Sequence, residues 1–300
     1  MEVEGKLIEF HTSDGFLLHG FLQMPRGAKT CVVYLHGMNG NFYRGRRVWE
    51  MAQKLNKNGV GFFTINTRGH DSLAKINARS SRKWGIMGGT HVEEFKDCIY
   101  DISGAINALR KLRFERFILA GHSTGCQKVI YYQYKRADRS VIGLLLLAPA
   151  DDYNGQKRDL GKKFAEAVRV SKALVRKRRG SETDNRIPDG FSAKRFLSVG
   201  DPRSAEARIF NYDGRLSEFS KIKEPICAVF GSREEHAVKP VKTYMKILGE
   251  KTHSKMFVPV IIKGAKHSFE NHNAALAKVA CDFASKVTKT TRSSISFKLT

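Results

Sequence analysis

The residues best suited to chemistry form the pentapeptide Gly-His-Ser-Thr-Gly, with Ser123 at its centre. An apolar run, Phe117–Ala120, precedes it, and a segment that can form a helix follows. A serine at such a strand-to-helix turn holds its hydroxyl clear of the sheet, and the flanking glycines let strand and helix approach closely. The alternative is a glycine-rich turn with a capping serine. The strand and helix context favours a nucleophile elbow, with Ser123 as the nucleophile.

A serine hydroxyl is a weak nucleophile near neutral pH and needs partners. An imidazole must accept its proton, and a carboxylate must fix the imidazole tautomer and stabilise its cation. His267 follows the last predicted strand, and Glu234 and Glu235 follow the strand before it. These residues come in the order nucleophile, acid, base. The sequence therefore predicts that Ser123, His267 and one of the two glutamates act together.

An earlier apolar strand supplies a candidate oxyanion hole. Thr30–Leu35 runs directly into His36, Gly37 and Met38. Acyl transfer places negative charge on the carbonyl oxygen, and fixed backbone N–H groups stabilise it by about 3 to 4 kcal/mol for each donor. The predicted donors are the N–H groups of Met38 and Thr124. We expect His36 to be buried and to hold the loop, because its position at the strand end directs it inward.

These motifs resemble those of the α/β-hydrolase superfamily over nearly the whole chain. The elbow followed by Cys126 and Gln127 is similar to a branch that includes siderophore-ester hydrolases, and His36–Asn41 is similar to feruloyl and acyl esterases. The resemblance implies a serine hydrolase that cleaves a carboxylic ester through an acyl-enzyme, without a cofactor. A thioesterase or an amidase with the same triad is the alternative. No His-Glu-x-x-His or similar metal spacing occurs.

The resemblance also bears on the choice of acid. Family members usually place aspartate three residues after a glycine, and counting from Gly231 reaches Glu234. Glu235 stays open, because the longer glutamate arm leaves the register uncertain. Asp151 and Asp152 are the reserve candidates, since some relatives draw the acid from the preceding strand.

Alternating apolar strands and amphipathic helices predict an α/β protein with a mostly parallel eight-stranded sheet covered on both faces. Helices are predicted at 44–56, 92–112 and 274–287, each with apolar residues at helical spacing. The predicted strands cover residues 6–11, 17–23, 30–35, 60–66, 116–120, 141–147, 225–230 and 256–262.

The alternation stops in one segment, which suggests the domain plan. We expect residues 1–150 and 221–288 to form the core, 151–220 a helical cap or lid over Ser123, and 289–300 a polar C-terminal tail. Aromatic and apolar residues of the cap can line an acyl or aryl pocket or form the cap's own core, and these are Phe164, Phe191, Phe196, Leu197, Phe210 and Tyr212.

The net charge of +24 raises a second class of function. Residues 157–179 hold ten Lys or Arg against two acids and end in Arg176–Arg179, and Arg44, Arg46 and Arg47 form another cluster. Next to the pocket, these charges would attract anionic substrates or lipid surfaces. The alternative is a solvated basic surface. A nucleic-acid or membrane-surface binding protein is the competing interpretation, but no interleaved basic and aromatic surface is evident, so we expect no nucleic-acid partner. The predicted partner is a small ester, anionic or aromatic.

Cysteines and apolar runs suggest the compartment. The five cysteines show no Cys-x-x-Cys spacing, which favours buried thiols in a reducing environment. No signal peptide is visible, and the longest apolar run is about half of the roughly 20 residues that cross a bilayer. A cytoplasmic protein without a transmembrane segment is predicted, and the oligomeric state stays open.

Overall fold

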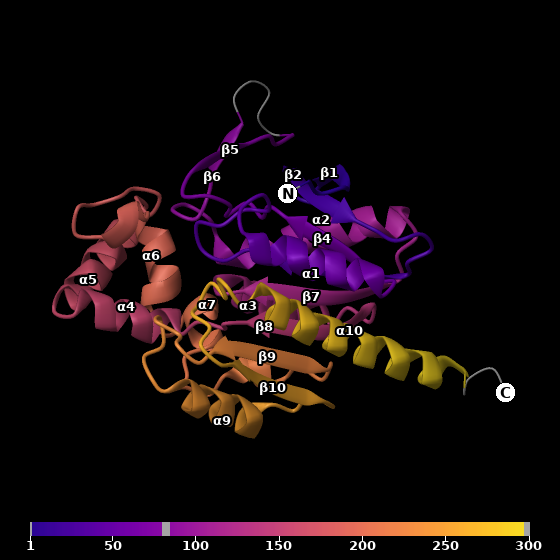
Figure 1. Ribbon diagram of the computed structural model, residues 1–300. Coiled ribbons are helices and arrows are strands. Elements are labelled where there is room, and N and C mark those ends of the chain that lie inside the picture. The colour runs from indigo at the N-terminus through magenta and orange to yellow at the C-terminus, as the bar shows by residue number, and fades with distance from the viewer. Residues whose placement is uncertain (1, 80–84, 297–300) are drawn as a thin grey trace.

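The computed structural model describes residues 2–79 and 85–296. The eight predicted strands form one sheet in the order β1-β2-β4-β3-β7-β8-β9-β10 (Figure 1). β2 pairs antiparallel with β1 and β4, and every other neighbouring pair in this sheet is parallel. The predicted fold class is confirmed. The strands are β1 (Lys6–His11), β2 (Leu17–Gln23), β3 (Thr30–Leu35), β4 (Gly61–Ile65), β7 (Arg116–His122), β8 (Val141–Leu147), β9 (Ile226–Gly231) and β10 (Phe257–Ile262).

The central strands are short apolar runs because helices cover both of their faces. Every residue of β3, β4 and β9 is buried. A strand with one solvated face would alternate polar and apolar residues, and β2 does alternate between buried and half-buried positions near the sheet edge. The continuous apolar pattern therefore predicted these strands correctly.

Two short strands were missed in the sequence. β5 (Ala74–Ile76) and β6 (Ile86–Gly88) form a separate antiparallel pair. Three-residue strands carry too little periodicity to be recognised. This pair lies beside the loop that follows β4.

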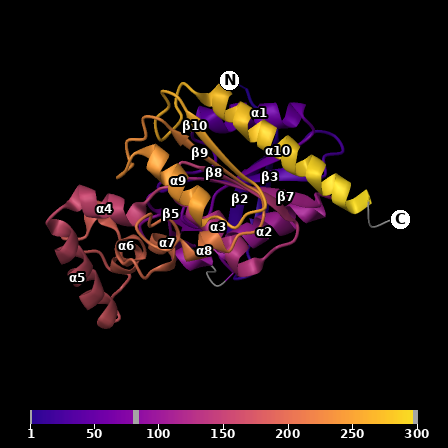
Figure 2. The ribbon, with the colours of Figure 1, turned by 90° about the horizontal axis from the view of Figure 1, so that it is seen from below.

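Helices cover the sheet in two layers (Figure 2). α1 (Arg46–Lys57) and α10 (Asn273–Ser296) pack together on one face, and α2 (Cys98–Lys111), α3 (Thr124–Arg136) and α9 (Val241–Lys251) lie on the other. The predicted helix at 92–112 begins later than expected, with the short helix η1 (Phe95–Asp97) before α2. All five cysteines are buried free thiols.

The C-terminal segment differs from the prediction. Residues 289–296, expected in a polar tail, continue α10. Residues 297–300 of that expected tail lie outside the described residues.

The segment 151–220 is helical, and two separate cores hold it. It contains α4 (Asp152–Leu160), α5 (Lys163–Arg176), η2 (Pro188–Gly190), α6 (Ala193–Gly200), α7 (Ala205–Ile209) and α8 (Ser217–Ser220). A small apolar cluster joins α5 to α6 and includes Phe191 and Phe196. Phe210 and Tyr212 instead belong to the main core. Figure 1 shows α4, α5 and α6 projecting to one side of the sheet.

The aromatic side chains of this segment serve packing. Phe191, Phe196, Phe210 and Tyr212 are at most 3% exposed, and Phe164 packs against the small cluster. None of them, nor Leu197, is among the residues that line the cavity at Ser123. The interpretation as the cap's own core is therefore the better one for Phe164, Phe191 and Phe196.

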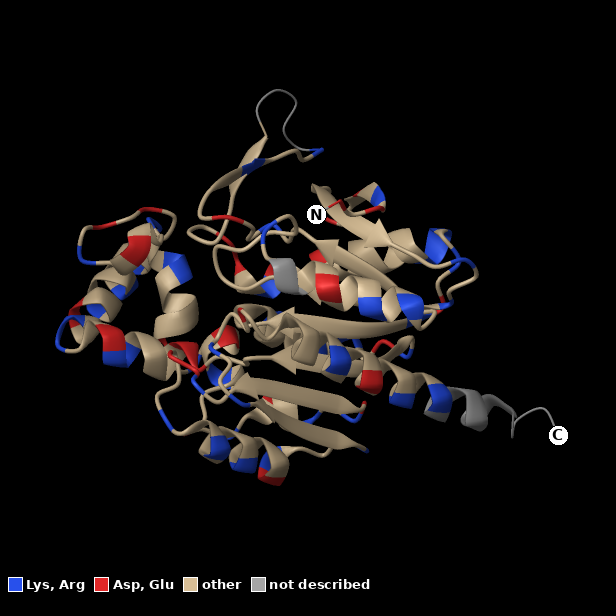
Figure 3. Ribbon diagram, in the orientation of Figure 1, with Lys and Arg blue, Asp and Glu red and all other residues tan. Residues whose placement is uncertain are grey.

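Within residues 2–79 and 85–296, no helix combines the length and apolar character needed to span a bilayer. Lys and Arg residues are spread over many helices and loops in the ribbon of Figure 3 and are not gathered at one edge of the molecule.

Candidate active site

Ser123 lies between the end of β7 and the start of α3, in a strained backbone conformation. Its φ and ψ angles are 54° and −125°. Positive φ is unfavourable for a residue with a side chain, and such strain persists only where the surroundings enforce it. The backbone N–H of Ser123 donates to Leu147 at the end of β8 at 2.9 Å, and its carbonyl accepts from Cys126 at 2.8 Å. The neighbouring strand and the first helical turn therefore hold the turn in place.

The two glycines of the pentapeptide are required by close backbone contacts. A Cβ atom on Gly121 would lie 2.3 Å from the carbonyl oxygen of Gly125. One on Gly125 would lie 2.6 Å from the carbonyl oxygen of Leu35, at the end of β3. Both distances are too short for a side chain. The helix therefore starts against the backbone of β7 and β3, which fixes the direction of the Ser123 side chain.

His267 and Glu234 form a hydrogen-bonded pair, although 33 residues separate them. His267 Nδ1 lies 2.7 Å from Glu234 Oε1, and the side chains are 14% and 3% exposed. Because a carboxylate only accepts, Nδ1 carries the proton and Nε2 is left as an acceptor. Glu234 Oε1 also accepts from the backbone N–H of His236 at 3.2 Å. The buried carboxylate thus fixes the tautomer that a general base needs.

Glu235 contacts the same loop in a different way. Its Oε2 accepts from the backbone N–H of His267 at 2.8 Å. Partial burial would raise the pKa of Glu235, but this hydrogen bond holds its pKa below the usual value. Glu235 therefore binds the backbone of His267, whereas Glu234 binds the ring.

Asp151 and Asp152 have other partners. Asp151 caps α4, where it accepts from the backbone N–H and the side-chain amide of Asn154 at 3.1 and 2.9 Å. Asp152 Oδ2 accepts from the Gln127 amide at 2.6 Å. Burial, with Glu206 and Asp151 nearby, raises the pKa of Asp152 well above its usual value. A carboxyl group that tends to stay neutral is poorly suited to stabilise an imidazolium.

Two further histidines surround His267, and sequence reasoning missed their part. His122 Nε2 donates to the His267 carbonyl oxygen at 2.9 Å, and the two rings are 4.9 Å apart. The His236 ring lies edge-on to His267 at 4.6 Å. His122 directly precedes Ser123 in the pentapeptide, and this position was the sequence signal that could have indicated its contact with His267. These contacts restrict the loop and ring of His267.

The turn after β3 packs directly against Ser123. A Cβ atom on Gly37 would lie 2.8 Å from Ser123 Cβ, so only a glycine lets the turn come this close. Met38 follows Gly37, and Thr124 is the first residue of α3, where the N–H has no carbonyl partner within the helix. Met38 and Thr124 both line the cavity at Ser123. The Met38 side chain also packs on the small apolar cluster of the cap segment.

A network of buried, hydrogen-bonded polar groups holds this turn in place. His36 Nδ1 donates to the Gly37 carbonyl oxygen at 2.8 Å, and His36 Nε2 accepts from the backbone N–H of Thr67 at 3.2 Å. The Lys128 ammonium donates to Thr67 Oγ1 at 3.2 Å and to Glu93 Oε2 at 2.7 Å. Burial and the nearby Lys128 charge lower the pKa of His36 to about 3. His36 is therefore neutral and structural at any pH near neutrality.

Segment 151–220 contacts the same set of buried polar groups through Arg195 of α6. Its guanidinium is fully buried, lies 3.6 Å from Glu93, forms an ion pair with Glu206, and donates to the Thr90 carbonyl oxygen at 2.9 Å. Thr90 Oγ1 accepts from the backbone N–H of Asn39 at 2.8 Å. Burial alone would raise the pKa of Glu93, but Lys128 and Arg195 hold it below its usual value. Ionised Glu93 therefore links two buried cations beneath the turn.

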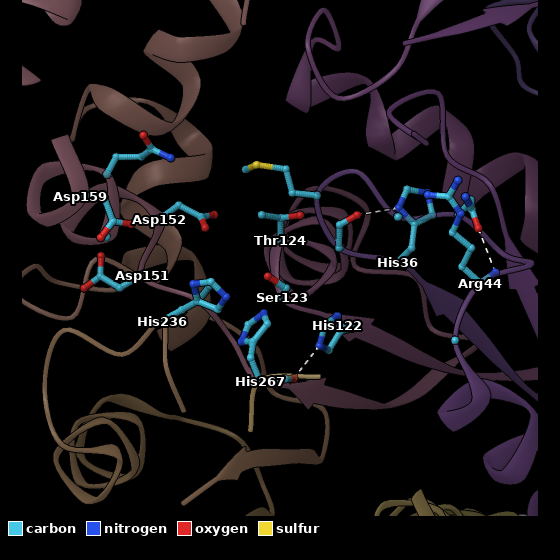
Figure 4. A pocket seen from close by; sticks show the side chains of 18 of the residues that line it. His36, Arg44, His122, Ser123, Thr124, Asp151, Asp152, Asp159, His236 and His267 are labelled. Atoms are coloured by element: carbon cyan, nitrogen blue, oxygen red, sulfur yellow. Dashed lines mark hydrogen bonds between the residues drawn. The ribbon is translucent and has the colours of Figure 1, made fainter. Parts of the chain in front are cut away.

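The cavity at Ser123 has a volume of about 440 Å³ and a mixed polar lining (Figure 4). His267, His122 and His236 lie on one side of it, and Asp152 and Asp159 of α4 on another. The Arg176–Arg179 cluster is not among the lining residues. Arg44 and Arg158 are the basic ones, and the side chains of Arg46 and Arg47 lie outside the described residues. In the described chain, no group of three or more His, Cys, Asp or Glu side chains is arranged to hold a metal ion.

A family model described as "Protein of unknown function (DUF1749)" matches residues 69–288, well over half of the chain. The chain belongs to the DUF1749 family. In this member, the matched region includes the elbow, Glu234 and His267, whereas the β3 turn lies before it. No curated protein matches the chain at a significant level.

Several solved structures similar to this DUF1749 protein are named as esterases or hydrolases. Est1E from Butyrivibrio proteoclasticus, with ferulic acid bound, shares 17% identity and a TM-score of 0.62, covering 93% of this chain and 99% of its own. The siderophore hydrolase EstB from Aspergillus fumigatus shares 14% identity and a TM-score of 0.68. The match covers 96% of this chain and 99% of the EstB chain. The Pyrococcus furiosus esterase PF2001 shares 17% sequence identity and a TM-score of 0.63. The match covers 94% of this chain and 91% of the PF2001 chain. These likenesses show the α/β-hydrolase fold.

The buried ion pair between Lys128 and Glu93 gives a testable prediction about stability. Lys128→Met leaves the Glu93 carboxylate buried with one cation fewer, so we expect a loss of about 3 to 5 kcal/mol in the free energy of unfolding. Lys128→Met combined with Glu93→Gln removes both charges and should recover a large part of this loss. Urea unfolding followed by circular dichroism measures both.

An exposed pair provides the control. Lys194 and Glu94 lie 2.9 Å apart with both side chains about half exposed. Lys194→Met should therefore lower the free energy of unfolding by less than about 1 kcal/mol. Equal losses for Lys128→Met and Lys194→Met would show that the buried pair does not carry the predicted charge penalty.

Proposed function

We propose that this protein is a serine hydrolase that cleaves carboxylic esters through an acyl-enzyme intermediate. The observation that carries the proposal is the 2.7 Å bond between His267 Nδ1 and Glu234 Oε1, beside a strained serine turn in one cavity. A base with a fixed tautomer next to a nucleophile elbow is what acyl transfer requires. The esterase names of the structural relatives support the same reaction class.

The proposed first step forms the acyl-enzyme. Ser123 Oγ attacks the ester carbonyl carbon while His267 Nε2 takes the hydroxyl proton. The N–H groups of Met38 and Thr124 stabilise the oxyanion of the tetrahedral intermediate. The carbon–oxygen bond to the alcohol then breaks, and His267 returns its proton to the leaving alcohol.

The second step releases the acid and restores the enzyme. Water attacks the acyl carbonyl, His267 accepts a proton from the water, and the bond to Ser123 Oγ breaks with return of that proton to the serine. Glu234 holds the His267 ring in both steps and stabilises its positive charge.

We also propose that residues 151–220 act as a cap between core segments 1–150 and 221–288. α4 supplies part of the cavity lining, which supports a role in access to Ser123. Because Arg195 is buried against Glu93 and Thr90, this cap stays anchored during the reaction and does not open as a whole.

The nucleophile assignment predicts the effect of Ser123→Ala. Removal of one hydroxyl should leave the protein folded and lower kcat for a chromogenic ester such as 4-nitrophenyl acetate by a factor on the order of 10⁶, to the background rate. Wild-type protein should also gain the mass of a fluorophosphonate label at Ser123, measured by intact-protein mass spectrometry. A folded Ser123→Ala protein that keeps more than about a tenth of the wild-type kcat would exclude Ser123 from the mechanism.

The acid assignment predicts different effects for neighbouring glutamates. Glu234→Gln keeps the side-chain size but removes the charge facing the His267 ring, so kcat should fall by a factor on the order of 10⁴. Glu235→Gln retains an oxygen that can accept from the His267 backbone, and we expect a change of less than about threefold. Steady-state kinetics with the same ester measure both variants.

Two other outcomes would change the assignment. A larger loss in Glu235→Gln than in Glu234→Gln would move the acid by one position. Mild effects in both, with a large loss in Asp151→Asn or Asp152→Asn, would place the acid after β8 and contradict the Glu234 assignment.

A further inference from the structure

A second hollow lies between the cap segment and the core, and it is larger than the cavity at Ser123. Its volume is about 740 Å³, within the range of small-molecule sites. Its walls come from η1 and α3 on the core side and from α6 and α7 on the other, and α7 lies beside α3 in Figure 2. The residues that line the two cavities form separate sets. This groove is therefore distinct from the proposed active site.

The lining of the groove includes apolar and aromatic side chains. The Phe95 and Tyr131 rings are 5.2 Å apart and tilted, and both residues are nearly buried. Leu197 is half-buried, and Val175 at the end of α5 is 36% exposed, a large apolar side chain left open to solvent. An aromatic ring or an acyl chain placed against Leu197 and Val175 would remove their exposed apolar surface from water.

The charged residues of the groove are mostly basic. Five Lys or Arg line it against two acids. Both acids are already paired, Glu94 with Lys194 at 2.9 Å and Asp201 with Arg203 at 2.9 Å. A third lining cation, Arg208, forms an ion pair with Glu218 outside the lining. Two lining cations, Lys96 and Lys135, are therefore left without a carboxylate partner in the described part of the chain. A concave surface with one sign of charge concentrates ions of the opposite sign.

Lys96 and Lys135 are the cations best placed to receive a ligand. Among the described residues, neither has a carboxylate partner. The Lys135 ammonium lies 5.6 Å from the centre of the Tyr131 ring and 5.4 Å from that of Tyr134. A cation beside an aromatic ring offers an anion and an apolar group adjacent sites.

We propose that this groove binds an organic anion that carries an apolar body. The acid group, a carboxylate, sulfonate or phosphate, pairs with Lys96 and Lys135, and the aromatic or acyl body lies against Leu197 and Val175. Because the groove and the Ser123 cavity have separate linings, the proposal holds whichever reaction Ser123 performs.

The test uses the full-length protein and the fluorescent probe 8-anilinonaphthalene-1-sulfonate, which joins an aromatic body to one sulfonate. Three variants each remove two positive charges. Lys96→Gln with Lys135→Gln changes the groove, and Lys242→Gln with Lys251→Gln changes the exposed face of α9. Arg44→Gln with Arg158→Gln changes the Ser123 cavity instead. Thermal unfolding shows that each variant is folded before titration.

We expect saturable binding to the wild type that weakens by about tenfold or more in the groove variant and by less than about twofold in the other two. The neutral analogue N-phenyl-1-naphthylamine should bind the wild type more weakly and be insensitive to the groove variant. Similar weakening in all three variants would mean attraction to the general +24 charge and would overturn the proposal.

Three other results would overturn it as well. Weakening confined to the Arg44 and Arg158 variant would place the probe in the Ser123 cavity. Equal affinity for the charged and neutral probes would remove anion recognition, and the lack of saturable binding would remove the site. Loss of the groove site would leave the proposed hydrolase unaffected, because Ser123→Ala kinetics test that function separately.

Discussion

The close approach of three backbones at Ser123 is the constraint on which the site depends. Gly121, Gly125 and Gly37 each lie where a Cβ atom would meet a neighbouring backbone or the Ser123 side chain at less than 3 Å. β7, α3 and the turn after β3 meet there, and the positive φ of Ser123 follows from that meeting. The sheet order places β3 beside β7, and this brings the turn after β3 close to Ser123 and the start of α3.

Much of the fold could be predicted from the sequence because burial on both faces leaves a plain signal. β3, β8 and β9 are mostly apolar runs, and each was found within one residue of its observed limits. β5 and β6 were not found, since their pairing depends on tertiary contacts around the loop after β4. The C-terminal helix was also underestimated, because its last turns carry few apolar residues to mark a buried face.

The candidate site was predictable where residues have their own chemical signature. Ser123 and His267 could be named from type, order and strand-end position, whereas Glu234 was favoured only by the spacing that the family resemblance implies. The separate contacts of Glu234 with the ring and Glu235 with the backbone needed coordinates. The buried Lys128 gave no sequence signal at all. A lysine in a helix is ordinarily read as solvated, and only the fold shows that it faces Glu93. The aromatic residues of segment 151–220 could not be assigned from the sequence, because the same residue types occur in packed cores and in ligand pockets.

Met38 connects the cavity at Ser123 with the apolar cluster between α5 and α6. Met38 follows Gly37, which lies against Ser123, and the Met38 side chain packs on the cluster formed by α5 and α6. A change in the packing of that cluster would therefore move the turn that contacts Ser123 together with one wall of the cavity. Under the proposed mechanism, a substitution in the cluster between α5 and α6 would alter both the shape of the cavity and the position of the Met38 N–H group that faces the oxyanion.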